Sequence, residues 1–257
     1  MSPRNPARQA ADSDTLEFWA RAGLVGWGVT HLLVAFLAAQ IALGRPDKEG
    51  DQSGALATIA EHPFGVAALV AVALGFLALV VWQGLEAAVG DHGAWGRVAA
   101  VGRAVIYGAL ALSAGKLVFG QGGSKADQQQ TLTAKVLSNP GGQWLVGLLG
   151  VAVVVGAGAL VWYGLSDRYA KHLSRTPTWV TWSARVGYAA KGLAYGIVGA
   201  LVVAAAVTFD AAKSRGLDEA LRTLAAQRHG TLLLGLVAAG LAAYGVFGLA
   251  QARYRKI

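Results

Sequence analysis

The sequence contains no cysteine among its 257 residues, and it has few charged side chains for its length. The lack of cysteine excludes disulfides, thiolate metal sites, iron–sulfur clusters and cysteine nucleophiles. Charged residues make up 14% of the chain, whereas a soluble domain carries about 25%. Hydrophobic residues make up 55%, which leaves too little polar side chain to cover a water-soluble globule. The composition therefore indicates an integral membrane protein.

Proline is also scarce, and its six copies all lie outside the long apolar stretches. Six stretches are long enough to cross a bilayer as helices, which takes about 20 mainly apolar residues. Lipid offers unpaired backbone amides no hydrogen-bond partner, and these runs lack the alternation of barrel strands. The sequence therefore predicts an all-α integral membrane fold with six transmembrane helices. The predicted spans are 22–43, 64–85, 98–119, 143–165, 187–208 and 231–250.

Positive charge is concentrated at one membrane face. Six spans place both termini on one side, and thirteen of the 22 Lys and Arg residues fall on that side. Because cytoplasmic loops carry an excess of Lys and Arg, this bias predicts cytoplasmic N- and C-termini. The net charge of +8 suits a bilayer with anionic headgroups, and no basic stripe with interleaved aromatics indicates nucleic acid. A membrane-protein partner or a homo-oligomer is the further kind of partner that we expect.

The chain repeats a two-helix pattern three times. Three helix starts share an arginine, a small residue and a histidine or tyrosine at matching spacing, and the first and third share two glycines as well. The matching residues are Arg21, Gly23, Gly28 and His31; Arg185, Gly187, Gly192 and Tyr195; and, more loosely, Arg97, Ala104 and Tyr107. Such repeats predict parallel hairpins related by an axis along the membrane normal. A pseudo-threefold bundle is the simplest arrangement, and a linear row is the alternative.

The repeat also predicts how the chain is divided. The loop at 54–65 corresponds to the loop at 219–230, and both have apolar positions at helical spacing. We therefore expect short interfacial helices in the outer loops. The predicted segments are a disordered cytoplasmic tail at 1–20 and repeats at 21–96, 97–180 and 181–257.

The loop sequence GALATIAEHPFG and the closing segment QARYRKI, within this three-hairpin arrangement, resemble a known bacterial family. It is a domain-of-unknown-function family of six-span membrane proteins built from this tandem two-helix repeat. The resemblance covers roughly residues 20–257. It implies the six-span fold and a location in the bacterial cytoplasmic membrane, and it implies no activity or cofactor.

A first candidate site consists of cations near the cytoplasmic face. Arg103 and Lys191 hold the same repeat position, six residues inside Arg97 and Arg185, or about 9 Å of helix rise. With Arg21, these residues form a candidate site for an anionic lipid or another anionic ligand. The alternative is that the two side chains reach the interface with their stems in lipid.

A second candidate is a polar cluster inside the membrane. His31 lies ten residues beyond Arg21, about 15 Å along the helix, and its repeat equivalents are Tyr107 and Tyr195. One imidazole and two phenols around a common axis would form a proton relay or hold a ligand. The alternative is a packed histidine that is hydrogen-bonded to a neighbouring hydroxyl or carbonyl.

No catalytic pattern is present: the spans contain no paired acids, HExxH motif or serine with a nearby base. The sequence predicts no catalytic residues, no metal site and no cofactor. We therefore expect a non-enzymatic accessory or scaffold subunit that binds lipid or a membrane partner. The alternative is a small-solute or proton transporter or channel with a path along the repeat axis. Polar residues that face one cavity would favour transport, whereas the same residues paired in a closed core would favour a subunit.

Overall fold

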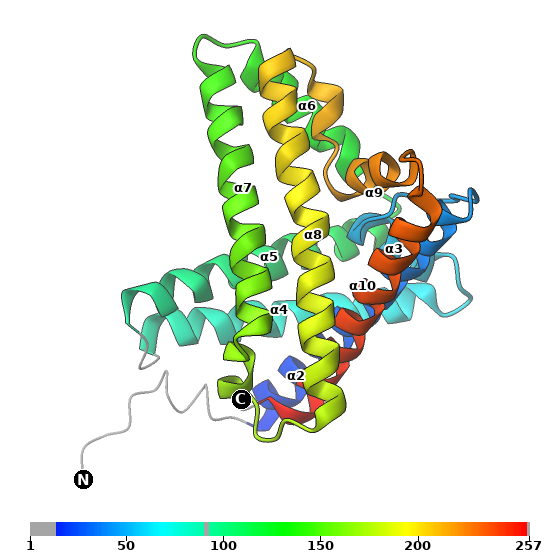
Figure 1. Ribbon diagram of the computed structural model, residues 1–257. Helices are drawn as coiled ribbons and strands as arrows, with labels where there is room; N and C mark the ends of the chain where they lie inside the picture. Colours follow the sequence, from blue (N-terminus) through cyan, green and yellow to red (C-terminus); the bar gives the residue numbers. More distant parts are fainter. Residues whose placement is uncertain (1–13, 90–92, 256–257) are drawn as a thin grey trace. The chain divides into compact units, whose positions relative to one another are not determined.

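Every regular element in the described part of the computed structural model is a helix. The structure describes residues 14–89 and 93–255 (Figure 1). Six long helices are apolar and long enough to cross a membrane, which confirms the predicted all-α fold with six spans. They are α2 (Asp14–Ala42), α4 (Gly65–Val89), α5 (Ala94–Val118), α7 (Gly142–Leu165), α8 (Thr178–Thr208) and α10 (Gly230–Tyr254).

Short helices occupy the loop between the two spans of each repeat, as predicted. They are α3 (Gln52–Ala60), α6 (Lys125–Leu137) and α9 (Leu217–Ala225). Two 3-10 turns, η1 (Arg168–His172) and η2 (Ala211–Ser214), flank α8. Helix α9 buries Ala220 and Leu221 and packs the partly buried Leu224 on the same core, which is the apolar face that its spacing predicts.

Two of the long helices begin eight or nine residues before the predicted spans. Helix α2 begins at Asp14 rather than at 22, and α8 begins at Thr178 rather than at 187. Hydropathy detects only the apolar part of a helix, whereas the backbone hydrogen bonds continue through polar and aromatic turns. Of the tail predicted at 1–20, residues 1–13 lie outside the described residues and 14–20 belong to α2.

The chain divides into two compact units. Unit 1 contains the described residues of Met1–Val29, Leu56–Gly122 and Gly248–Ile257, and unit 2 contains Thr30–Ala55 and Gly123–Phe247. Three of the four boundaries fall inside α2, α3 and α10, so these helices contribute residues to both units, and the fourth falls between Gly122 and Gly123. The units do not coincide with the repeats, because helices of successive repeats pack on one another: α4 on α5 in unit 1, and α7 on α8 in unit 2.

One glycine position sets the contact between the two spans of a repeat. In unit 1, Gly23 of α2 lies against Gly75 of α4, where a Cβ would overlap the Gly75 carbonyl oxygen. In unit 2, the equivalent Gly187 of α8 lies against Tyr244 of α10, where a Cβ would be 2.6 Å from the tyrosine backbone nitrogen. Small residues allow this close approach of helix backbones in a membrane.

A second glycine position sets the contact between different repeats. A Cβ on Gly28 of α2 would be 2.8 Å from the backbone nitrogen of Leu249 in α10. A Cβ on the equivalent Gly192 of α8 would be 2.8 Å from the carbonyl oxygen of Ala157 in α7. The glycines shared by the first and third helix starts therefore have two separate packing roles.

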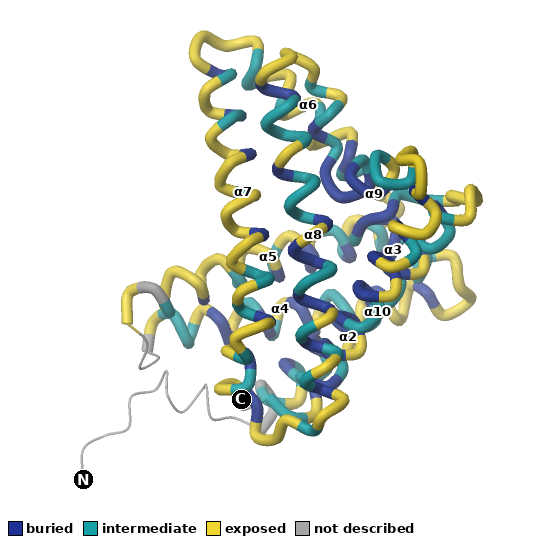
Figure 2. The backbone as a smooth tube through the Cα atoms, viewed as in Figure 1, coloured by how far each residue is buried: buried dark blue, intermediate teal, exposed yellow. Residues whose placement is uncertain are grey.

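Unit 2 has an apolar core between α2, α8 and α10 that α3 and α9 cover. The buried residues of this core are Val34, Ala35, Leu37, Ala38, Ile41, Ala55, Ala194, Leu217, Leu221, Leu234, Val237, Ala238 and Leu241. In contrast, most of α7 is exposed along its length (Figure 2), and its exposed side chains include Leu148, Leu149 and Val155. An apolar surface of this kind fits a helix that faces lipid.

Glycine packing between α7 and α8 gives a testable prediction. A Cβ on Gly150 would lie 2.7 Å from the backbone nitrogen of Val203 and 3.0 Å from the carbonyl oxygen of Gly199. We expect Gly150→Ala to lower the free energy of unfolding by about 1–3 kcal/mol, because the backbones must separate. Thermal unfolding in detergent, followed by tryptophan fluorescence, measures the loss.

Gly156→Ala on the same helix is the matched control, because no neighbouring atom lies within 4 Å of its added methyl group. This variant should unfold at or above the temperature of the parent, since alanine favours the helix over glycine by about 1 kcal/mol. Equal destabilisation by both variants would contradict the packing role of Gly150.

Candidate functional site

A lysine and a histidine from different repeats are in contact inside unit 2. Lys191 lies thirteen residues into α8, about 20 Å from its start, and its residue is only 8% exposed. Its Nζ lies 3.3 Å from Nε2 of His31 in α2. His31 is 2% exposed. Ionisable side chains at such depth in a membrane are costly, and they therefore mark a candidate functional site.

Tyr244 completes this cluster. The Nζ of Lys191 lies 4.1 Å from the ring centroid of Tyr244, and the Tyr244 and His31 ring centroids are 4.9 Å apart. The face of an aromatic ring attracts a cation, so Tyr244 stabilises an ammonium group at this depth. Sequence analysis missed Tyr244, because nothing in the pattern of α10 distinguishes it from other aromatic residues. We refer to Lys191, His31 and Tyr244 as the buried Lys–His–Tyr cluster.

Further tyrosines extend the cluster toward the start of α8. Tyr188 packs edge-to-face on Tyr244 with ring centroids 5.2 Å apart, and Tyr163 packs on Tyr188 at 5.2 Å. Tyr169 of η1 stacks on Tyr188 at 6.2 Å. Such edge and offset contacts between rings are favourable. We refer to Tyr244, Tyr188, Tyr163 and Tyr169 as the tyrosine ladder.

The ladder ends at an ion pair. The Tyr169 hydroxyl donates to a carboxylate oxygen of Asp167 at 2.9 Å, and Arg185 donates to both oxygens, from Nη2 at 2.6 Å and from Nε at 3.0 Å. The hydrogen bond from Arg185 lowers the pKa of Asp167. Burial, together with the adjacent carboxylate, raises the pKa of Tyr169 to about 12. The Tyr169 hydroxyl therefore stays protonated at neutral pH and donates to Asp167.

In the other direction, the cluster leads to an outer loop. The Nζ of Lys191 lies 5.8 Å from the ring centroid of Tyr195, one turn further along α8. The Tyr195 hydroxyl accepts a hydrogen bond from Gln52 Nε2 at 3.4 Å. Gln52 is the first residue of α3 and follows Asp51, whose carboxylate accepts from the backbone nitrogen of Ser53 at 2.8 Å. Asp51 therefore acts as the N-cap of α3 and fixes its start.

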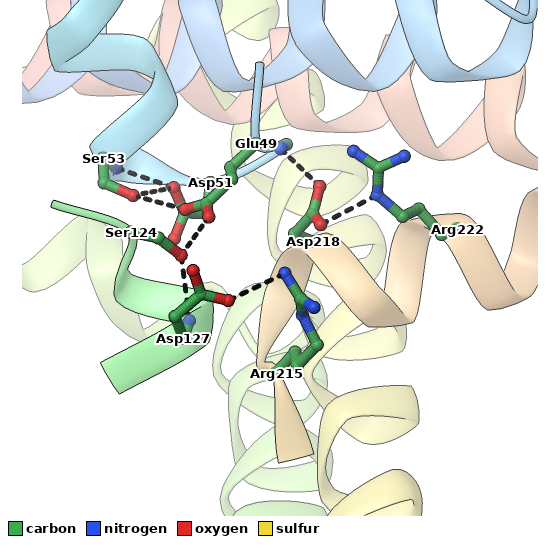
Figure 3. A network of polar contacts seen from close by, with 9 residues as sticks. Glu49, Asp51, Ser53, Ser124, Asp127, Arg215, Asp218 and Arg222 are labelled. Atoms are coloured by element: carbon green, nitrogen blue, oxygen red, sulfur yellow. Dashed lines mark hydrogen bonds and ion pairs between the residues drawn. The ribbon is translucent and has the colours of Figure 1, made fainter. Parts of the chain in front are cut away.

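Loops from all three repeats meet in a network of polar contacts in unit 2 (Figure 3). Ser124 donates a short hydrogen bond to Glu49, and it caps α6 by accepting from the backbone nitrogen of Asp127 at 2.9 Å. Arg215 in turn pairs with Asp127 at 3.1 Å. The first repeat is thus linked to the second, and the second to the third.

Asp218 links the third repeat to the first. Its carboxylate accepts from the backbone nitrogen of Gly50 at 2.8 Å and from Arg222 Nε at 2.8 Å, as Figure 3 also shows. The Asp218 side chain is only 3% exposed, so these two donors compensate for its burial. We refer to Glu49, Asp51, Ser53, Ser124, Asp127, Arg215, Asp218 and Arg222 as the outer loop network.

Unit 1 contains a second set of the predicted residues. Arg103 Nε donates to Gln83 Oε1 at 3.0 Å. Tyr107 packs edge-to-face on Trp27 at 5.5 Å and stacks on Phe76 at 6.3 Å. Trp27 holds the same repeat position as Lys191, and Tyr107 the same position as His31. Each unit therefore makes the equivalent inter-repeat contact, but only the pair in unit 2 is a lysine and a histidine.

The residues of the predicted cation site and of the predicted polar cluster do not stay together as two separate sets in the structure. Lys191 and His31 were predicted in separate sets, yet they contact each other, whereas Arg103 and Tyr107 belong to unit 1. Among the remaining arginines, Arg185 is held by Asp167. Arg21 is held by Glu17 at 2.6 Å and by the backbone carbonyl of Ala252 at 2.7 Å, and Arg97 is exposed. Whether these arginines bind an anionic ligand stays a prediction.

Metal ligands do not gather in the part of the chain that the structure describes. Within residues 14–89 and 93–255, no three His, Asp or Glu side chains are close enough to hold a metal ion. The buried cluster itself consists of an amine, an imidazole and phenol hydroxyls, which donate, accept and exchange protons.

The ion pair at Asp167 predicts a pH dependence of stability. The pKa of Asp167 is lower in the folded chain than the value of about 3.9 expected when unfolded. Its stabilising effect is therefore complete above the unfolded pKa and is lost as the pH falls through the folded pKa. Both side chains are 39% exposed, so solvent screens the pair and its effect on stability at neutral pH is small.

We therefore expect Asp167→Asn to unfold at a slightly lower temperature than the parent at about pH 7 and at the same temperature at about pH 2. Melting curves at both pH values measure this convergence. Glu61→Gln, at an exposed acid outside this pair, is the control and should not reproduce the change. A pH-independent difference between Asp167→Asn and the parent would contradict the assignment.

Comparison with known proteins identifies the family. The domain of unknown function DUF1206 matches the chain three times, at residues 22–90, 98–167 and 186–255, which confirms the three tandem repeats. The chain is also 30% identical over 250 residues to the uncharacterized protein YxxB of Bacillus subtilis (strain 168), covering 92% of this chain and 90% of that protein. No solved structure matches the chain. The chain carries three tandem copies of the DUF1206 domain, and the protein therefore belongs to the DUF1206 family.

Proposed function

We propose that the protein is a non-enzymatic subunit of the bacterial cytoplasmic membrane that binds a lipid or a membrane-protein partner. The observation that carries this proposal is the pairing of polar side chains inside the packed spans of unit 2. Thr30, His31 and Lys191 are at most 8% exposed, and Lys191 contacts His31 and Tyr244. Polar groups that contact one another in a closed core support a binding subunit over an open path.

The continuity of the spans gives further support. The described spans are uninterrupted α-helices, whereas many transporters use discontinuous helices to form their substrate sites. In addition, the outer loop network joins the loops of three repeats in one unit. A chain whose loops are joined in this way suits a rigid scaffold.

The orientation and symmetry of the bundle belong to the same proposal. The excess of Lys and Arg on the side of the termini supports cytoplasmic N- and C-termini. The contacts at Trp27–Tyr107 in unit 1 and at Lys191–His31 in unit 2 join equivalent repeat positions, which supports repeats that each pack on a neighbouring repeat through the same positions.

Native mass spectrometry of the protein after mild extraction from its own membrane tests the proposed function. We expect a stoichiometric adduct, either a protein subunit or a specific lipid, that survives removal of the detergent. An extract of similar membranes that lack the protein controls for the partner's own signal. A bare monomer or homo-oligomer would contradict the proposal and would favour transport.

A second candidate function is proton transfer across the membrane. Its support is the row of groups in unit 2 that leads from Asp51 and Gln52 through Tyr195 and the buried Lys–His–Tyr cluster to the tyrosine ladder and Asp167. Adjacent tyrosine rings contact through their edges, so transfer between their hydroxyls requires intervening water. Histidine is the side chain in this row whose ordinary pKa lies closest to neutral pH, and Lys191 lies beside it as a second group that can carry a proton.

Proton flux into liposomes tests this second function. If the row conducts, the parent should exceed empty liposomes, and Lys191→Met should lower the flux at least about tenfold because it removes the central proton carrier. Lys116→Met is the control, since Lys116 of α5 lies outside this row. Equal flux in the parent and Lys191→Met, or no flux above that of empty liposomes, would exclude proton transfer.

A further inference from the structure

A groove lies in unit 2 at one end of the spans. By the order of the spans along the chain, this is the end opposite the side that holds the two termini. It has a volume of about 780 Å³, within the range of roughly 300–1,000 Å³ for small-molecule sites. Its walls come from the end of α2, the turn that follows, the end of α9 and the start of α10, and they include Ile41, Leu43, Arg222, Ala226 and Thr231.

The turn after α2 gives the groove an apolar rim. Helix α2 ends in a cap in which Gly44 has a φ of +70° and the backbone nitrogen of Arg45 donates to the carbonyl of Gln40 at 2.9 Å. This cap is typical of helix C-termini and satisfies the last carbonyl groups. It leaves Leu43 at the surface with 69% of its area exposed. An exposed leucine at the end of a span lies where lipid acyl chains begin.

Arg222 is the charged residue that lines the groove. Its Nε donates to Asp218, and Figure 3 shows the two Nη atoms at the tip of the side chain, beyond the Nε that makes this hydrogen bond. The side chain is 42% exposed, so the Nη groups are accessible. A guanidinium fixed at Nε presents its remaining N–H groups in the fork geometry that matches a phosphate.

We propose that this groove binds one membrane phospholipid, with its phosphate on the Arg222 guanidinium and an acyl chain along the wall formed by Leu43 and Ala226. The occupant is a lipid rather than free phosphate because apolar residues and one guanidinium line the same groove at the end of the spans. Since Asp218 pairs with Arg222 and the carboxylates of Glu219 and Glu49 also interact with its charge, recognition depends on hydrogen bonds to the phosphate more than on net charge. The site should therefore accept phospholipid headgroups that carry an amine to neutralise the phosphate charge as well as headgroups that do not.

This inference rests on the proposed function and names its ligand and site. Nothing in the sequence indicates it, because sequence analysis places the candidate lipid site at the opposite membrane face, around Arg103 and Lys191. Arg222 differs from Arg215, which also pairs with a carboxylate, in that Arg222 lines the groove and its partner Asp218 is buried.

Delipidated protein titrated with dioleoyl phosphatidylglycerol, dioleoyl phosphatidylethanolamine or dioleoylglycerol, followed by native mass spectrometry, tests the site. We expect one bound molecule of either phospholipid and at least about tenfold weaker binding of dioleoylglycerol, which lacks the phosphate. Inorganic phosphate at the same concentrations should not compete. Equal binding of dioleoylglycerol, full competition by phosphate, or no bound phospholipid would each overturn the proposal.

Paired variants locate the binding. Arg222→Gln should weaken phospholipid binding about tenfold, and Arg228→Gln, at an exposed arginine that does not line the groove, should not. Because Arg222→Gln also removes the partner of the buried Asp218, a second pair leaves this ion pair intact. Ala226→Trp should fill the groove and abolish binding, whereas Gln227→Trp at the next exposed position should not.

The two proposals fail in different ways. If the variants bind phospholipid like the parent while the protein still carries a partner or another lipid out of its own membrane, only the groove assignment is wrong. If the delipidated protein binds phospholipid through Arg222 but leaves its own membrane without any adduct, the subunit role is wrong and the groove assignment holds.

Discussion

Close contact between helix backbones at glycine is the interaction on which the rest of this structure depends. Lipid tails are as apolar as leucine, so helices in a membrane gain little from burying apolar surface and associate through tight packing instead. Gly150 and Gly199 bring α7 against α8, and Gly187 brings α8 against α10. Because α8 is held on both sides, Lys191 is fixed in the interior of unit 2 rather than at a lipid-facing surface.

The repeated packing lets one position carry different chemistry. Trp27 and Lys191 are equivalent in the repeat, and so are Tyr107 and His31, and both pairs are in contact. In unit 1 the contact is between two aromatic rings and is largely apolar. In unit 2 it is between an amine and an imidazole, with Tyr244 beside them. The framework thus does not require an ionisable pair, which is why the buried Lys–His–Tyr cluster is the residue set that most needs a functional explanation.

The outer loop network has a double role in the fold. Asp51 and Ser124 each cap a short helix, and Ser124 also donates to Glu49 of the first repeat. Asp218 lies in the first turn of α9, where a carboxylate is favourable at the positive end of the helix dipole, and it contacts Gly50 of the first repeat. The same side chains that start the short helices therefore join the repeats. This arrangement also fixes Arg222 beside the groove at the end of α2.

The amino-acid sequence predicts the membrane class, the six spans, the triple repeat and the short helices of the outer loops. These features follow from hydropathy and residue spacing, which are local properties of the chain. The tertiary structure decided that Lys191 meets His31 and Tyr244, and that Arg222 lies beside Leu43 in one groove. Residues this far apart along the chain are in contact only if the helices that carry them pack against each other. Which helices pack together depends on the pairing of their glycine-containing surfaces, and helical spacing alone does not specify this pairing.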